Sequence, residues 1–153
     1  GCVYIDDKIL KKDIDHPENI GVLIENPNFW KRYTGMETLK LLADIRKQAT
    51  EDDIKNALVR VGLEPSDKRV VRKYSLGMRQ KLGIAQAIME KPDILLLDEP
   101  TNALDKKSVE QVRKIIHEEA ERGAIVIIAS HNPQDIEGCS AILEMAEGRV
   151  CDE

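Results

Sequence analysis

The stretch Ile94-Leu95-Leu96-Leu97-Asp98-Glu99-Pro100 decides the fold class of this 153-residue chain. Consecutive aliphatic residues that end on charged residues and a proline are typical of a strand buried on both faces, as in a parallel sheet. A second such run, Ala124 to Ser130, follows a helical pattern over residues 106–121 that Gly123 ends, and Asn19 to Glu25 is an earlier one. Because apolar strands alternate with helices, the sequence predicts an α/β fold whose parallel sheet is covered on both faces.

Further strands are expected near both ends of the chain. Val3 to Leu10 is interrupted by the turn-like pair Asp6-Asp7, and Ala141 to Met145 is an apolar run after a short helix near Pro133. The start of the chain has neither an initiator Met nor the pattern of a signal peptide, so we expect it to be cut from a longer protein.

From Thr34 to about Glu90 the hydrophobic period is that of helices. Thr34 with Glu37, and Thr50 with Asp53, have the spacing of capping boxes, in which a hydroxyl and a carboxylate satisfy free backbone donors at a helix start. A third helix is expected over residues 76–90. The residues expected to face inward are Met36, Leu39, Leu42, Ile45, Ile54, Ala57, Leu58, Val61, Met78, Leu82, Ala85 and Met89, with Val109, Val112 and Ile116 in the later helix.

The composition excludes several classes of protein. With 42% hydrophobic and 33% charged residues, the chain is neither collagen-like, nor of low complexity, nor wholly disordered. The net charge of −5 argues against a protein that mainly coats nucleic acid. No apolar run approaches the roughly 18 to 20 residues that span a bilayer. The cysteines, Cys2, Cys139 and Cys151, lack metal-site spacing and fit a reducing cytoplasm.

The candidate chemistry lies where the central strand ends. Asp98 and Glu99 follow each other there, and neighbouring strand residues point to opposite faces, so one carboxylate is free to hold a hydrated Mg²⁺ while the other addresses a water. The helix start at Ser75-Leu76-Gly77 offers backbone donors and a hydroxyl to an anion. His131 follows the next strand and is expected beside the carboxylates. Each feature alone also fits an ordinary strand end, helix start or structural histidine.

Taken together and in order, these segments resemble the ATP-binding-cassette (ABC) ATPases. The matching segments are Tyr74 to Met78 for the LSGGQ signature, Leu95 to Asp98 with Glu99 for the Walker B strand and its glutamate, Ala103-Leu104-Asp105 for the D-loop, His131 for the switch histidine, and Ile20 to Glu25 for the strand entering the Q-loop. The segments around Glu25 and the signature are most similar to bacterial exporter ATPases linked to bacitracin and other peptide antibiotics.

The resemblance implies a partial RecA-like parallel sheet, with the P-loop strand missing and an α-helical subdomain inserted. Residues 1–33 would form the N-terminal strands and Q-loop region, 34–90 the helical subdomain, and 91–153 the rest of the core. The 153 residues contain no G-x-x-x-x-G-K-[ST] sequence. In the family that loop follows a strand between those matching Ala124 to Ser130 and Ala141 to Met145. We therefore expect a separate polypeptide in the gap, a strand-swapped dimer, or a rearranged or partly disordered C-terminal third.

The resemblance also assigns roles to residues. Glu99 and His131 would be catalytic, Ser75, Gly77, Glu25 and Asp105 would contact ATP, and Asp98 and Glu25 would hold Mg²⁺. Three of the family's signals differ here, because Glu25 replaces a glutamine, Leu76 a glycine and Met78 a glutamine. With no phosphate loop in these residues, we expect weak MgATP binding and no measurable hydrolysis by the chain alone.

The function implied is that of an ATP-hydrolysing subunit of an ABC exporter. It would form a homodimer and dock a transmembrane permease subunit through Phe29 to Tyr33, at the cytoplasmic face of the membrane and without nucleic acid. Two alternatives remain open: a soluble ABC ATPase acting on ribosomes or nucleic acid, and a non-enzymatic relic that serves as a binding module. Phe29-Trp30 fits core filling as well as docking.

Overall fold

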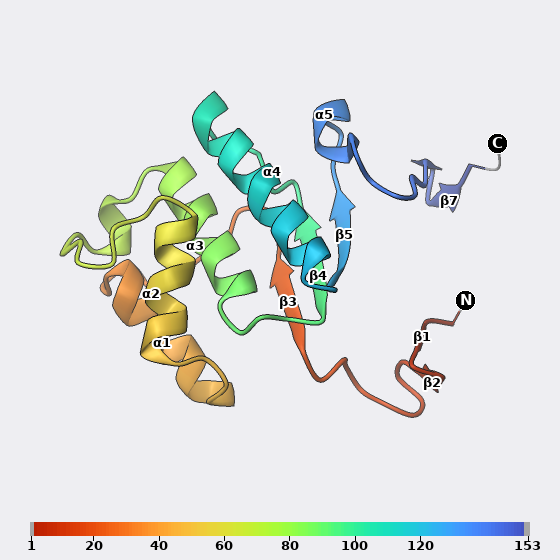
Figure 1. The fold of residues 1–153 in the computed structure, drawn as a ribbon, viewed down its shortest axis with the longest axis horizontal. Coiled ribbons are helices and arrows are strands. Elements are labelled where there is room, and N and C mark those ends of the chain that lie inside the picture. Colours follow the sequence, from red (N-terminus) through yellow and green to blue (C-terminus); the bar gives the residue numbers. More distant parts are fainter. Residues whose placement is uncertain (1, 152–153) are drawn as a thin grey trace.

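The computed structural model describes residues 2–151 as a small sheet flanked by helices, with a two-stranded hairpin near each end (Figure 1). The elements in chain order are β1 (Tyr4–Ile5), β2 (Lys8–Ile9), β3 (Ile20–Leu23), α1 (Gly35–Arg46), α2 (Glu51–Arg60), a 3-10 turn (Val71–Lys73), α3 (Leu76–Ile88), β4 (Ile94–Asp98), α4 (Lys106–Glu121), β5 (Ile125–Ala129), α5 (Pro133–Ile136), β6 (Met145–Ala146) and β7 (Arg149–Val150).

The central sheet has three parallel strands in the order β3-β4-β5. Leu97 of β4 lies opposite Leu23 of β3 and Ile128 of β5, so the carboxyl ends of all three strands meet at one edge. The expected α/β class with a parallel sheet is confirmed. This edge is where open α/β sheets place ligands.

Helices cover only one face of this sheet in the described part of the chain. Leu95 and Leu97 point toward α3 and α4 and are 0% and 3% exposed. On the opposite face, Ile125 and Ile127 of β5 keep 63% and 55% of their surface exposed. The expectation of a sheet covered on both faces is therefore wrong, because no helix between residues 2 and 151 lies over that second face of β5.

The first two helices begin as the sequence predicts. Thr34 and Thr50 are their N-caps, and each forms a complete capping box, with Glu37 and Asp53 respectively. Gly62, just after α2, has φ +73°, a backbone conformation that glycine adopts without steric cost. Local backbone chemistry therefore fixes where these helices start and where α2 ends.

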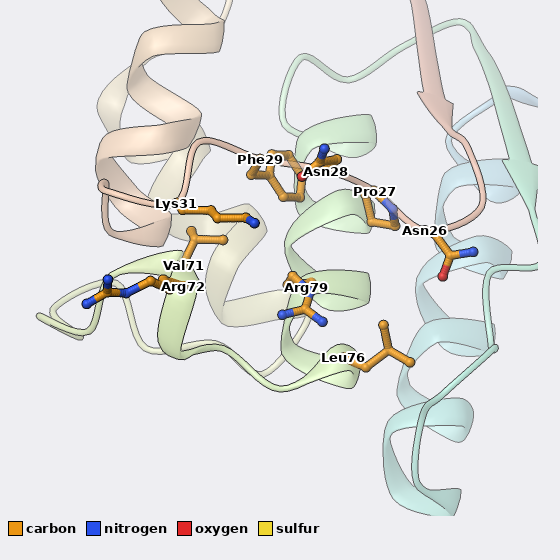
Figure 2. A pocket seen from close by; sticks show the side chains of 9 residues that line it. All are labelled: Asn26, Pro27, Asn28, Phe29, Lys31, Val71, Arg72, Leu76 and Arg79. Carbon is orange, nitrogen blue, oxygen red and sulfur yellow. The ribbon is translucent and has the colours of Figure 1, made fainter.

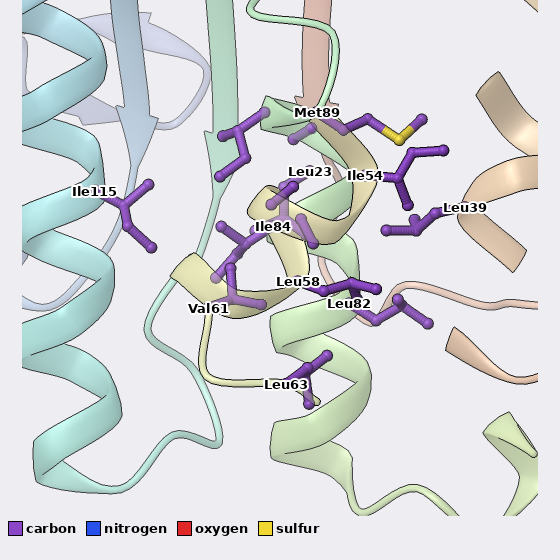
Figure 3. Packing of buried hydrophobic residues seen from close by; sticks show 14 of the residues in the cluster. Leu23, Leu39, Ile54, Leu58, Val61, Leu63, Leu82, Ile84, Met89 and Ile115 are labelled. Carbon is purple, nitrogen blue, oxygen red and sulfur yellow. The ribbon is translucent and has the colours of Figure 1, made fainter. Parts of the chain in front are cut away.

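The core lies between α1, α2, α3, α4 and the covered face of the sheet (Figure 3). Leu39, Leu58 and Leu82, from α1, α2 and α3, are at most 1% exposed. The inward face of α1 differs from the expected one, because Ile45 is 75% exposed while Ala43 is buried. Successive three-residue steps fall behind a helix of 3.6 residues per turn, so the fourth position of the expected series has rotated out of the core.

Gly21 allows β3 and α3 to approach closely. A Cβ atom at this position would lie 2.0 Å from the backbone oxygen of Ala87 and 2.9 Å from a side-chain carbon of Pro92. Because neither neighbour is a flexible side-chain end, no other residue fits without moving the helix.

The ends of the chain form separate hairpins. Strands β1 and β2 join at Asp6 and Asp7, whose positive φ angles suit a tight hairpin turn, as expected from that pair. The strand expected over residues 141–145 is wrong. Only Met145 begins a strand, and β6 pairs with β7 rather than with the central sheet, which ends at β5. The segment after α5 is thus arranged differently from the expected strand, while a second polypeptide in the gap and a strand-swapped dimer stay predictions.

None of the helices within residues 2–151 has the length and apolar character needed to cross a bilayer.

Candidate functional site

Glu99 and His131 form a hydrogen-bonded pair at the carboxyl edge of the sheet. Oε1 of Glu99 lies 2.7 Å from Nδ1 of His131 and accepts the backbone N–H of His131 at 3.0 Å. The backbone N–H of Glu99 donates to the carbonyl oxygen of Ala129 at 2.8 Å, which extends the pairing of β4 and β5 by one residue. Two contacts from one histidine to a single carboxylate oxygen fix both side chains in place.

The two partners differ in exposure. The side chain of Glu99 is 18% exposed, while that of His131 is 85% exposed. The hydrogen bond to Glu99, followed by the attraction of the same carboxylate, raises the pKa of His131 above its ordinary value. With Nδ1 bound to Glu99, Nε2 faces away from the carboxylate, and protonation makes it a hydrogen-bond donor. The pair therefore offers a carboxylate and, when His131 is protonated, an outward hydrogen-bond donor for an anionic ligand.

Asp98 and Glu25 lie side by side at the ends of β4 and β3. The backbone N–H of Glu25 donates to Oδ2 of Asp98 at 3.4 Å. Both side chains supply only carboxylate oxygens, the ligand type that Mg²⁺ prefers, and a Mg²⁺ held by one or two carboxylates keeps waters and takes phosphate oxygens. No group of three or more metal-binding side chains gathers among residues 2–151, so these two fit such a sparsely held ion rather than a closed cage.

Ser75 and Gly77 stand at the start of α3. Ser75 is the N-cap, and its Oγ accepts the backbone N–H of Met78 at 3.1 Å. A Cβ atom on Gly77 would lie 2.9 Å from the backbone oxygen of Ala103, so the start of α3 approaches the loop after β4 closely. The structure thus places the expected anion-binding helix start beside that loop, and the hydroxyl of Ser75 forms no hydrogen bond to Glu99.

Asp105 caps α4. It accepts the backbone N–H of Ser108 at 3.0 Å and the hydroxyl of Ser108 at 2.9 Å. The backbone bond and then the hydroxyl bond lower the pKa of Asp105. Within the described residues its contacts are those of a helix cap, and its expected role at ATP stays a prediction.

Gln80 is a site residue that the sequence analysis missed. Its side chain is buried in α3, and Nε2 donates to the backbone oxygens of Glu99 at 2.9 Å and Pro100 at 3.3 Å. Glu99 has φ +47°, which few residues other than glycine adopt, and these bonds hold its peptide in place. The available signal was a glutamine on the inward side of a helix that otherwise buries aliphatic residues.

A cavity of about 540 Å³ opens between the segment after β3 and the start of α3 (Figure 2). Its lining residues are Asn26, Pro27, Asn28, Phe29, Lys31, Val71, Arg72, Leu76 and Arg79. Backbone bonds from Val71 to Tyr33 and from Arg72 to Lys31 hold two of its walls together.

The two aromatic residues beside this cavity differ in how far they are buried. Phe29 lines the cavity and packs against the core. Trp30 is 52% exposed and packs edge to face on Tyr33, with the two ring centroids 6.4 Å apart. The core-filling interpretation is therefore confirmed for Phe29 and wrong for Trp30, and docking stays a prediction.

A three-stranded parallel sheet with carboxylates, a helix start and an imidazole at its carboxyl edge places the chain in the α/β class with a candidate ligand site at that edge. The family model described as ABC transporter matches residues 1–102. The chain is 48% identical over 151 residues to the uncharacterized ABC transporter ATP-binding protein YybJ of Bacillus subtilis, covering 98% of the chain and 69% of YybJ. It belongs to the ABC transporter family.

Other relatives carry exporter names. The chain is 38% identical over 136 residues to the bacitracin transport ATP-binding protein BcrA of Enterococcus faecalis, covering 88% of the chain and 44% of BcrA. It is 37% identical over 118 residues to the lantibiotic transport ATP-binding protein SrtF of Streptococcus pyogenes, covering 77% and 51%. The chain thus spans about half the length of these relatives.

Solved structures agree on the fold. The chain superimposes on the ATP-binding cassette MJ0796, in a dimeric post-hydrolysis state bound to ADP and Pi, with a TM-score of 0.75. The two are 24% identical, and the match covers 88% of this chain and 64% of that one. A second dimeric structure of MJ0796 gives a TM-score of 0.77 at 23% identity and covers 90% and 65%.

Proposed function

We propose that this chain carries the water-activating part of an ABC exporter's ATP-binding subunit, which couples ATP hydrolysis to transport through a membrane partner. The observation that carries the proposal is the Glu99–His131 pair at the end of β4. The names of BcrA and SrtF support the exporter class.

In this proposal Glu99 orients or deprotonates the attacking water. Its Oε1 is occupied by His131, while the contact of Oε2 with Ser130 Oγ is long, at 3.4 Å, which leaves Oε2 able to accept from a water. His131 donates from Nε2 to the transferred phosphoryl group, whose negative charge favours the imidazolium that Glu99 already stabilises.

Asp98 and Glu25 are the residues that would hold Mg²⁺, which neutralises charge on the phosphate oxygens when bound. Asp98 presents its carboxylate at the strand end, where Glu25 meets it through a backbone N–H. Because a carboxylate repels a phosphate, Glu25 would bind the ion or one of its waters rather than the phosphate itself.

Ser75 and Gly77 would contact the γ-phosphate bound by a second subunit, with Asp105 near the shared interface. The start of α3 carries unpaired backbone donors and the positive end of the helix dipole. The dimeric state of the MJ0796 cassette supports a homodimer here.

The cavity beside Phe29 would receive the membrane partner and so place the chain at the inner face of the membrane. Lys31, Arg72 and Arg79 line it, and none of the three forms an ion pair with a carboxylate of residues 2–151. Figure 2 shows Lys31 and Arg79 extending into the space between the walls. Unpaired cations in a chain of net charge −5 favour a partner segment with an acidic residue.

The hydrolysis proposal is tested in two preparations. The 153-residue chain alone is expected to release phosphate from ATP at background rate. A chimera that supplies a G-x-x-x-x-G-K-[ST] segment ahead of Gly1 is expected to hydrolyse ATP, with a loss of about 100-fold or more in Glu99→Gln. A chimera that binds ATP and turns it over equally with Glu99→Gln would overturn the role of Glu99.

The docking proposal is tested by charge reversal. Lys31→Glu in the same chimera is expected to weaken copurification with its permease. Lys107→Glu, an exposed position on α4 outside the cavity, is the matched control. Equal copurification of both variants would contradict the cavity as the docking site.

A further inference from the structure

Asp135 is a buried carboxylate whose contacts the proposed mechanism does not use. Its side chain is 1% exposed, although α5 lies at the surface. It accepts hydrogen bonds from the hydroxyls of Thr101 at 2.5 Å and Ser130 at 3.0 Å, and from the guanidinium of Arg113 at 2.9 Å. A charge buried to this extent is stable only because each of these donors is present.

The three donors come from three separate parts of the site. Thr101 lies in the loop after Glu99, Ser130 directly precedes His131, and Arg113 comes from α4. Asp135 therefore joins the two loops that carry the proposed catalytic pair and ties both to the helix that supports the sheet.

Ser130 stands between two carboxylates. Its Oγ lies 3.0 Å from Oδ2 of Asp135 and 3.4 Å from Oε2 of Glu99, and it accepts the backbone N–H of Asn132 at 3.1 Å. A hydroxyl has one proton to donate, and the shorter distance directs it to Asp135. Oε2 of Glu99 consequently keeps its lone pairs for another donor.

We propose that Asp135 is a positioning residue. It accepts the hydrogen bond of the Ser130 hydroxyl and thereby keeps Oε2 of Glu99 free to accept a hydrogen bond from the attacking water. The proposal rests on the proposed function for the role of Glu99. In the absence of the Asp135 carboxylate, the Ser130 hydroxyl would turn to Glu99 and compete with both the water and His131.

The imidazole of His131 reports on this competition because it shares the Glu99 carboxylate. The carboxylates that bear on it are Glu99, Asp135 and Glu25. A new donor to Glu99 weakens its interaction with the imidazolium, so the pKa of His131 falls. NMR titration measures this in the nucleotide-free 153-residue chain, which separates the test from that of ATP hydrolysis.

The experiment is a double-mutant cycle of Asp135→Asn and Ser130→Ala. Asp135→Asn is expected to lower the pKa of His131 by about half a pH unit, as one weakened hydrogen bond would. Adding Ser130→Ala is expected to restore most of that loss, because the competing hydroxyl is gone. Comparing Ser130→Ala with the double variant measures the part that is due to the lost Asp135 charge alone, because neither protein has the competing hydroxyl.

If Asp135→Asn does not fold, Asp135→Glu takes its place, because it keeps a charge for Arg113 and displaces the oxygen that meets Ser130. Asp135→Glu is then expected to lower the pKa of His131 in the same way, and Ser130→Ala is expected to restore it. If the pKa of His131 falls by the same amount with and without Ser130→Ala, the proposal is overturned and the role of Asp135 is structural or purely electrostatic.

Discussion

The two faces of the sheet differ sharply in how completely the chain covers them. The face toward α3 and α4 is closed, with Leu95 and Leu97 almost fully buried. The opposite face of β5 leaves Ile125 and Ile127 more than half exposed, and apolar residues of the following segment, including Leu143 at 77%, are also exposed. One face is buried in the hydrophobic core, whereas the other is an apolar surface that no helix in residues 2–151 covers.

This difference separates the part of the site that the chain builds alone from the part that it does not. The carboxylates, the imidazole and the start of α3 all rest on elements that pack on the closed face. The segment after α5 forms only a small hairpin. We therefore expect substitutions to have large effects on the closed side and small ones on the open side.

The largest effect on stability is expected from shortening a side chain on the closed face. Leu95→Ala removes a side chain that is 0% exposed and leaves a cavity, so it should lower the free energy of unfolding by about 2 to 5 kcal/mol. Ile127→Ala, on the open face of the neighbouring strand, should cost less than about 1 kcal/mol. Urea denaturation followed by circular dichroism measures both. Equal losses would show that the second face is covered in solution.

A smaller but still clear effect is expected at Gly21. Gly21→Ala forces the backbone of α3 away from β3 and should cost about 1 to 3 kcal/mol. Gly123→Ala, between α4 and β5, serves for comparison, because its Cβ would meet no atom within 4 Å and its cost comes from the φ of +103° alone. The same denaturation experiment compares the two. A Gly21→Ala variant as stable as the unchanged chain would contradict the close packing of α3 on β3.

The third effect depends on pH. The hydrogen bond from Lys91, followed by those from Thr50, lowers the pKa of Asp53 to about 2. A carboxyl whose folded pKa lies below its unfolded value of about 3.9 stabilises the fold above that value, and this stability is lost as the pH falls toward 2. Asp53→Asn should therefore cost about 1 kcal/mol at pH 7 and flatten the stability profile between about pH 4 and pH 2.

Denaturation midpoints measured from pH 7 to pH 2 test this prediction. Asp52→Asn is the control, because the Asp52 side chain is 95% exposed and its one ion pair is 3.8 Å long. An acid profile that Asp53→Asn leaves as steep as before would mean that the second capping box contributes nothing to this dependence.

The parts of the fold that the sequence predicts well are those set by local chemistry. Thr34 and Thr50 cap their helices with side chains three positions along the chain, and Asp6-Asp7 forms its turn alone. The predictions that were wrong concern elements that depend on segments distant in the sequence. An apolar run such as residues 141–145 forms a strand only if another strand lies beside it, and the pattern does not contain that information.

The candidate site shows the same division. The strand-end argument predicts that His131 lies beside Glu99, and the two are hydrogen bonded. Gln80 and Asp135 were missed because each meets a site residue far away in sequence or across a turn. No periodicity in the sequence marks a buried polar side chain whose partners come from other elements.

The most direct test of the account is the titration of His131 in the chain with and without Glu99→Gln. NMR follows its imidazole resonance, with His16 and His117 as internal references and His131→Gln for assignment. The account predicts a pKa above the ordinary value in the unchanged chain and a fall toward about 6.5 in Glu99→Gln. A pKa of His131 that is the same in both proteins would contradict the pairing of carboxylate and imidazole on which the proposed hydrolysis rests.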